Sequence, residues 1–165
     1  MKTIYLKTAI ALMALTFASC SSDSSSSTPV NTAKTTFKLD GVLITADETT
    51  ATDYDNLGAG GRYIDVYVMK DGKQILELHM PAANGTYPAQ HDTFTMSNSW
   101  LTYQANDGLN FPDDYFESAS GSMVLTTTDL VGNKLRGTFS FVGDNTTTTK
   151  NITEGNLVVN TMTHQ

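Results

Sequence analysis

Short segments in which apolar and polar residues alternate recur along the chain from residue 37 onward. They are rich in Val, Ile, Thr, Tyr and Phe, and Gly, Asn and Asp separate them. Alternation with a period of two, interrupted by turn residues, is typical of β-strands. The pattern predicts an all-β domain over residues 37–161, either a single antiparallel β-sandwich or a partly open β-barrel, followed by a C-terminal tail at residues 162–165.

Turn-forming residues predict where some of the strands are connected. Asp40-Gly41 is a two-residue hairpin signal between the alternating strands Phe37–Leu39 and Val42–Ile44. Glu154-Gly155 is expected to close the last hairpin in the same way. The segment Thr45–Gly61 is acidic and contains glycine, so we predict a solvated loop there.

The hydrophobic pattern also selects a turn for the hairpin around Lys70-Asp71-Gly72. A two-residue turn in a regular hairpin would place apolar residues opposite charged ones. A three-residue loop instead pairs Val66 with Leu76 and keeps the apolar residues on one face. The same register sets Asp65 directly opposite Glu77.

This register places Asp65, Glu77 and His79 together on the polar outer face of the hairpin. Facing carboxylates repel one another unless something screens them. A divalent cation could bridge the two carboxylates with His79 as a further ligand, which makes the three residues a candidate metal site. The simpler alternative is a solvated face that water and salt screen. No other cofactor is predicted.

The chain begins with Lys2 and Lys7, followed by an uncharged, largely apolar stretch over residues 8–18. This stretch is shorter than the about 20 residues that span a membrane and is typical of a secretory signal peptide. Leu15–Cys20 resembles a bacterial lipobox, in which the leader is cut before a cysteine that is then acylated. We therefore expect a lipoprotein signal peptide at residues 1–19 and a lipidated Cys20. Cleavage after Ala18, which would release a secreted protein with a free thiol, is one alternative, and a buried core helix is the other.

Residues 20–36 are dominated by Ser and Thr, a composition that predicts a disordered, flexible tether between the anchor and the β domain. The whole chain holds 17 acidic and 10 basic residues, and its basic residues do not cluster. Such a chain lacks the Lys and Arg that displace counterions from nucleic acid, so we expect no nucleic-acid partner. The predicted contact with the membrane is the lipid anchor.

Aromatic residues are concentrated in the least regular part of the domain, residues 81–118. Flat rings on exposed loops can stack on sugar faces, and neighbouring carboxylates can accept hydrogen bonds from sugar hydroxyls. Trp100 and Tyr103, with Asp113 and Asp114, are therefore the candidate ligand-binding residues. The alternative is that these rings belong to the core, because aromatic residues dominate burial in small β domains.

Several segments share a cadence of turn glycines and alternating strand residues: Gly121–Thr126, Leu135–Phe141, Asn151–Leu157, Leu39–Gly41 and Asn84–Tyr87. In these segments the chain resembles a group of small β-rich outer-membrane lipoproteins of Bacteroides-type bacteria whose function is unknown. The resemblance implies an all-β fold and an outer-membrane location, on either the periplasmic or the surface face. It carries no catalytic residues.

The sequence contains no G-x-S-x-G, H-E-x-x-H, P-loop or dinucleotide motif. Asp113, Asp114 and Glu117 could be imagined as glycosidase carboxylates, but adjacent acids beside a proline are typical of a hydrated turn. We expect a membrane-anchored, non-enzymatic lipoprotein that binds a glycan or an envelope protein. A structural or accessory subunit of an envelope complex is the alternative, and a hydrolase is the third interpretation.

Overall fold

The structure is a computed structural model that describes residues 33–55, 61–90, 95 and 97–165. The predicted signal peptide, Cys20 and most of the predicted tether lie outside the described residues. Within them the chain forms eleven β-strands and one 3-10 turn at Asn106–Gly108. The strands are β1 (Thr36–Leu39), β2 (Val42–Thr45), β3 (Glu48–Tyr54), β4 (Tyr63–Lys70), β5 (Lys73–Pro81), β6 (Gly85–Pro88), β7 (Trp100–Gln104), β8 (Tyr115–Asp129), β9 (Lys134–Asp144), β10 (Thr149–Val159) and β11 (Met162–His164).

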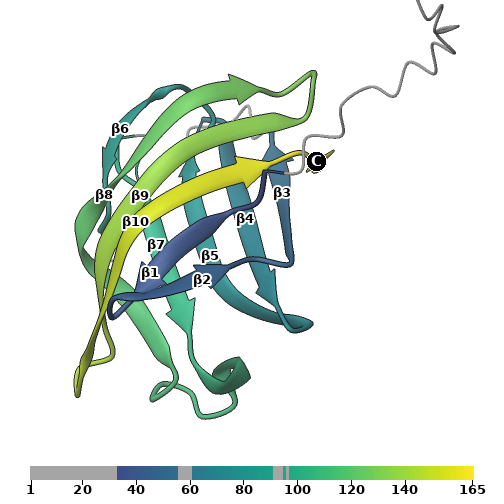
Figure 1. Cartoon of the computed structure of the whole chain (residues 1–165). Helices are drawn as coiled ribbons and strands as arrows, with labels where there is room; N and C mark the ends of the chain where they lie inside the picture. Colours follow the sequence, from purple (N-terminus) through teal and green to yellow (C-terminus); the bar gives the residue numbers. More distant parts are fainter. Residues whose placement is uncertain (1–32, 56–60, 91–94, 96) are drawn as a thin grey trace, which may run out of the picture. The chain divides into compact units, whose positions relative to one another are not determined.

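All of these strands belong to one sheet in the order β11-β3-β4-β5-β7-β8-β9-β10-β1-β2, and β6 pairs with β8. Neighbours are antiparallel except for β11, which runs parallel to β3. The sheet curls into an open half-barrel, so that β1 and β2 come round in front of β3, β4 and β5 (Figure 1). The predicted all-β fold is confirmed.

The concave side of the curled sheet holds the hydrophobic core. Successive side chains of a strand point to opposite faces, so every second residue is buried. On β4 and β5 the residues of the core are Ile64, Val66, Val68, Leu76, Leu78 and Met80. Phe37, Leu101, Met123, Leu135, Ile152 and Leu157 contribute to the same core from other strands. The residues between them face outward.

The register of the β4–β5 hairpin differs from the prediction. The strands pair directly beside Asp71-Gly72, a two-residue turn in which both residues have positive φ. A bulge at Ile75 then shifts the register by one residue and keeps the apolar side chains on the core face. As a result Asp65 lies opposite His79, and not opposite Glu77 as expected.

Of the two remaining turn predictions, the one at Asp40-Gly41 is confirmed. The one at Glu154-Gly155 is wrong, because β10 runs without a turn from Thr149 to Val159. Glu154-Gly155 forms a bulge in which Glu154 has a φ of 51°. Gly155 is needed there, since a Cβ would lie 2.5 Å from the carbonyl oxygen of Phe139. A turn and a bulge can both use a positive-φ residue beside glycine, so the same dipeptide fits either.

Two segments predicted to lie outside the strands belong to the sheet. Glu48–Tyr54, within the expected loop, forms β3, and Met162–His164, within the expected tail, forms β11. The inward residues of β3 are Ala51 and Asp53. A small side chain and a charged one do not produce an apolar alternation, which is why the pattern did not reveal this strand.

The folded part also begins before residue 37. Thr35, placed in the predicted tether, is buried. Its hydroxyl donates to the carbonyl of Val158 and accepts from the amide of the same residue. The side chain of Thr35 thus extends the pairing of β10 beyond the start of β1.

Candidate ligand-binding face

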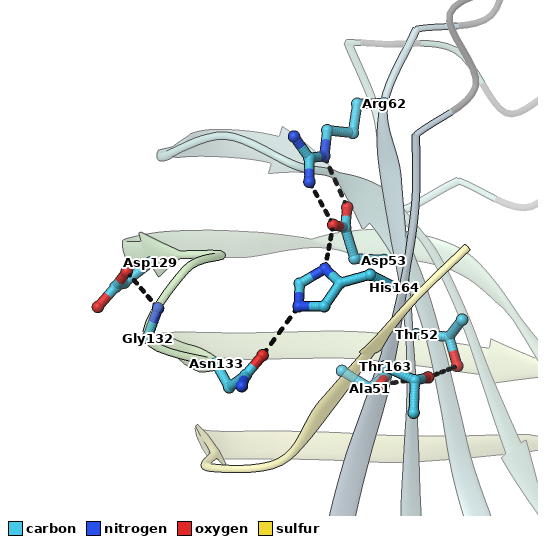
Figure 2. A network of polar contacts seen from close by, with 9 residues as sticks. All are labelled: Ala51, Thr52, Asp53, Arg62, Asp129, Gly132, Asn133, Thr163 and His164. Carbon is cyan, nitrogen blue, oxygen red and sulfur yellow. Dashed lines mark hydrogen bonds and ion pairs between the residues drawn. The ribbon is translucent and has the colours of Figure 1, made fainter.

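Asp53 on β3 is the centre of the polar network drawn in Figure 2. Arg62 donates to both carboxylate oxygens, with an Nε–Oδ1 distance of 2.8 Å and an Nη2–Oδ2 distance of 2.5 Å. Nδ1 of His164 lies 2.8 Å from Oδ2 of Asp53, and Nε2 lies 2.9 Å from Oδ1 of Asn133. The network therefore joins β3, the residue before β4, the C-terminal strand β11 and the β8–β9 turn (Figure 2).

Within this network the buried charge is compensated. Asp53 is 0% exposed. The hydrogen bonds and charge of Arg62, with a smaller contribution from His164, hold the pKa of Asp53 below its ordinary value in spite of burial. The Asp53 carboxylate in turn raises the pKa of Arg62. A buried charge that is paired and hydrogen-bonded in this way holds its surroundings in place. The geometry thus fits a structural role, fastening the C-terminal strand to the sheet.

A surface pocket of about 570 Å³ lies beside the network and is lined by Arg62, Thr128, Asp129, Leu130, Val131 and His164. Its volume is within the range of small-molecule sites. However, Arg62 and His164 are both bound to Asp53, and Asp129 accepts a hydrogen bond of 2.8 Å from the amide of Gly132. The charged groups around this pocket already have partners within the chain.

The outward side of β3, β4, β5 and β7 carries a different set of side chains. Large rings and acidic groups gather there on the convex surface of the sheet, opposite the core. We call this set the aromatic face, and it consists of Tyr54, Tyr63, Asp65, Tyr67, Glu77, His79 and Trp100.

Four rings of this face form a row across the four strands. The ring centroids of Tyr54 and Tyr63 lie 4.8 Å apart with an interplanar angle of 19°. Those of Tyr63 and His79 lie 4.5 Å apart, and those of His79 and Trp100 lie 6.2 Å apart. The register accounts for the row, because Tyr54 pairs with Tyr63 and His79 pairs with Trp100. All four residues keep a part of their surface exposed, so the row is partly open to solvent.

The polar members of the aromatic face are shielded from solvent by their neighbours. Asp65 and His79 are hydrogen-bonded through Oδ1 and Nδ1, and their side chains are only 14% and 18% exposed. Burial and the charge of Asp65 raise the pKa of Glu77. Burial, with the charges of Asp65 and Glu77, also raises the pKa of Tyr67 to about 12. Perturbed ionisation that clusters on a surface is typical of functional sites.

The structure separates the two predicted aromatic ligand-binding residues. Trp100 points outward and belongs to the aromatic face. Tyr103 has the opposite parity on β7 and packs against the core, with its ring centroid 5.9 Å from that of Phe116. The two rings therefore do not line a common groove.

The two predicted acidic ligand-binding residues are also in different environments. Asp114 is buried, and its carboxylate accepts hydrogen bonds from Asn106 and from the backbone and side chain of Asn110. It therefore organises its own loop. Asp113 is exposed, and its carbonyl accepts a hydrogen bond from the side chain of Asn145.

The candidate metal ligands lie on one face, as predicted, but in a different arrangement. Asp65 binds His79, while Glu77 lies opposite Tyr67 and accepts a hydrogen bond of 3.3 Å from Gln74. Among the described residues, no group of three or more His, Cys, Asp or Glu is placed to hold a metal ion. The geometry gives no support to the metal site.

The Asp53 network was not expected from the sequence. Its members are far apart in the chain, and Asp53 was assigned to a solvated loop. The only available signal was the pair Asp53 and Arg62 on either side of that loop, which does not by itself indicate burial. Tyr54 and Tyr63 were likewise not recognised as neighbours, because the strand that carries Tyr54 was not predicted.

A scan against protein-family models and searches of curated proteins and of solved structures found no match to this chain. Among the described residues, no helix is long and apolar enough to cross a membrane.

Proposed function

We propose that this protein is a lipoprotein, anchored to the outer membrane through Cys20, whose β domain binds a glycan without transforming it. The observation that carries the proposal is the row of four rings from Tyr54 to Trp100, partly open to solvent on the convex side of the sheet. Aromatic rings stack on the apolar faces of sugars, and carboxylates such as Asp65 and Glu77 accept hydrogen bonds from sugar hydroxyls.

Binding by the aromatic face is tested with purified domain on an array of bacterial and host glycans. Trp100→Ala and Tyr63→Ala are each expected to weaken retention at least tenfold, because each removes a ring from the row. Phe111→Ala is the matched control, since Phe111 is an aromatic residue 75% exposed in the loop before β8. Melting curves show whether each variant is folded. The proposal fails if the folded Trp100 and Tyr63 variants bind like the wild type, or if recovered glycans are cleaved.

The anchor is supported by the lipobox-like segment Leu15–Cys20 and by the resemblance to small lipoproteins of Bacteroides-type bacteria. In a native-type host, radiolabelled palmitate is expected to enter the wild-type protein and not the Cys20→Ala variant. The wild type should fractionate with the outer membrane. A mature wild-type protein with an unmodified thiol at Cys20, or with its first residue at Ser19, contradicts the anchor and leaves glycan binding untouched.

A second candidate function, an accessory subunit of an envelope complex, is favoured by the edge strand β2. In the part of the chain that the structure describes, β2 pairs only with β1, and Val42 and Leu43 on it are 65% and 63% exposed. Uncovered edges of this kind accept further strands. Crosslinking in native membranes should then capture a partner that Leu43→Lys loses, whereas loss with Trp100→Ala would indicate the aromatic face.

A further inference from the structure

If the aromatic face binds a glycan, as proposed above, its charge selects the kind of sugar. The strand segments that form the face are residues 50–54, 63–67, 77–81 and 100–104, and none of them contains Lys or Arg. They do contain Asp65 and Glu77 on the outer side. Thr102 on β7 pairs with Glu77 on one side and with Glu117 of β8 on the other, so Glu117 lies in the same row across the sheet, two strands from Glu77. The face is therefore acidic as well as aromatic.

The hydrogen-bond partners of Asp65 and Glu77 leave their negative charge only partly neutralised. Asp65 is hydrogen-bonded to His79, whose imidazole is the one basic side chain in these segments. Glu77 accepts a hydrogen bond from the neutral amide of Gln74. Burial, and after it the negative charge of Asp65, favours the protonated form of Glu77, and both raise its pKa. A positive charge placed beside the two carboxylates would reverse this effect.

The rings of the face favour the same kind of ligand. An aromatic ring attracts a cation through the negative potential of its face, by about 0.5–2 kcal/mol depending on desolvation. Tyr63 packs against the His79 ring that binds Asp65, and Tyr67 lies directly opposite Glu77 on the neighbouring strand. Rings beside carboxylates are the combination that recognises ammonium groups. A neutral sugar would stack on the rings but would not neutralise the negative charge of the carboxylates.

We infer that the aromatic face recognises an amino sugar with a free, protonated amine, and that the ammonium group binds between Asp65 and Glu77. Glucosamine is the simplest sugar of this class. Its N-acetylated form has the same ring and lacks the charge, which provides a matched neutral ligand.

The test is calorimetric titration of the purified domain at about pH 6 with glucosamine and N-acetylglucosamine oligomers of equal length. The glucosamine oligomer is expected to bind at least tenfold more tightly, and its affinity should fall as salt is added. Glu77→Gln should reduce this affinity about tenfold, because it removes the charge and keeps the shape. Glu154→Gln is the control, since Glu154 is an exposed acid paired with Lys38 on the other side of the half-barrel.

The outcomes separate this inference from the proposed function. Equal binding of the two oligomers, lost in Trp100→Ala, overturns the preference for an amine and supports glycan binding. Tighter binding of the N-acetylated oligomer also overturns it. If neither oligomer binds while the array detects another glycan, the assignment to an amino sugar is wrong and the proposal of glycan binding remains. If an oligolysine peptide binds as tightly as the glucosamine oligomer and Glu77→Gln weakens both, the face recognises the ammonium group without the sugar, and the assignment to an amino sugar is wrong.

Discussion

Asp53 and Glu77 are carboxylates on strands of the same sheet, and their surroundings shift their pKa values in opposite directions. Asp53 is buried at the centre of a network in which Arg62 and His164 supply hydrogen bonds and positive charge, so its pKa is lowered. Glu77 lies on the outer side, where burial by its neighbours and the charge of Asp65 raise its pKa. The more deeply buried acid is thus the one that keeps its charge more easily.

This difference distinguishes two uses of polar groups. In the Asp53 network the charges have partners within the chain, and the result is a stable connection between β3 and the C-terminal strand. On the aromatic face the acids repel one another, and partly exposed rings surround them. A folded domain retains such an unfavourable arrangement where it serves binding. The comparison gives the Asp53 network a structural role and agrees with the proposal that the aromatic face binds a ligand.

The largest expected effect on stability comes from removing the charge of Asp53. Asp53→Asn keeps the shape of the side chain and leaves Arg62 without a counter-charge, so we expect a loss of about 2–4 kcal/mol in the free energy of unfolding. Urea unfolding at pH 7 measures it. Glycan binding by the variant that remains folded should be unchanged. A loss below about 0.5 kcal/mol would show that the network does not hold the fold together.

The pH dependence of stability should separate the two acids. The pKa of Asp53 is lower in the folded state, so its contribution is complete above its unfolded pKa near 3.8 and is lost as the pH falls through its folded value. The advantage of the wild type over Asp53→Asn should therefore be constant near neutrality and shrink in acid below about pH 4. Melting temperatures of both proteins across a pH series measure this. A constant difference down to pH 2 would contradict it.

Glu77 should behave in the opposite way and with a smaller effect. Its pKa is raised in the folded state, so its contribution is most favourable at low pH, where it is protonated, and falls as the pH rises through the folded value. Glu77→Gln should therefore stabilise the domain at pH 7 by up to about 1 kcal/mol, and the gain should vanish in acid. If Glu77→Gln instead destabilises the domain at pH 7, the negative charge of Glu77 is not unfavourable in the folded state.

The smallest effect is expected at the exposed ion pair between Lys38 and Glu154, whose Nζ–Oε1 distance is 2.7 Å. Solvent screens a pair of this kind, and such pairs contribute about 0–1 kcal/mol. Glu154→Gln should change the free energy of unfolding by less than about 1 kcal/mol at pH 7, which unfolding under the same conditions will show. This value is the baseline against which the Asp53 and Glu77 variants are compared.

Much of the fold could be predicted from local pattern. The alternation on β4 and β5 and the turn at Asp40-Gly41 depend on neighbouring residues, and both were recognised. Strand β3 could not be recognised in this way, because its inward positions hold Ala51 and Asp53. The burial of the Asp53 carboxylate depends on Arg62 and on His164, which lies 111 positions along the chain from Asp53.

The candidate site was predicted in part. Trp100 was identified, as was the shared outer face of Asp65, Glu77 and His79. The register of the β4–β5 hairpin was not predicted. A two-residue turn followed by a bulge at Ile75 and a three-residue loop both keep the apolar residues on one face, so the hydrophobic pattern does not separate them. The separation of Trp100 from Tyr103 follows from strand parity, which could be assigned only once the limits of β7 were known.

By itself the sequence determined the all-β class, the alternation that builds the core and the lipobox-like segment that suggests an anchor, because each depends on residues close together in the chain. The tertiary structure decided which distant strands pair, which acid is neutralised by partners and which rings form a row. Those outcomes depend on the curvature of the sheet and on bulges, which bring together residues that no local pattern connects.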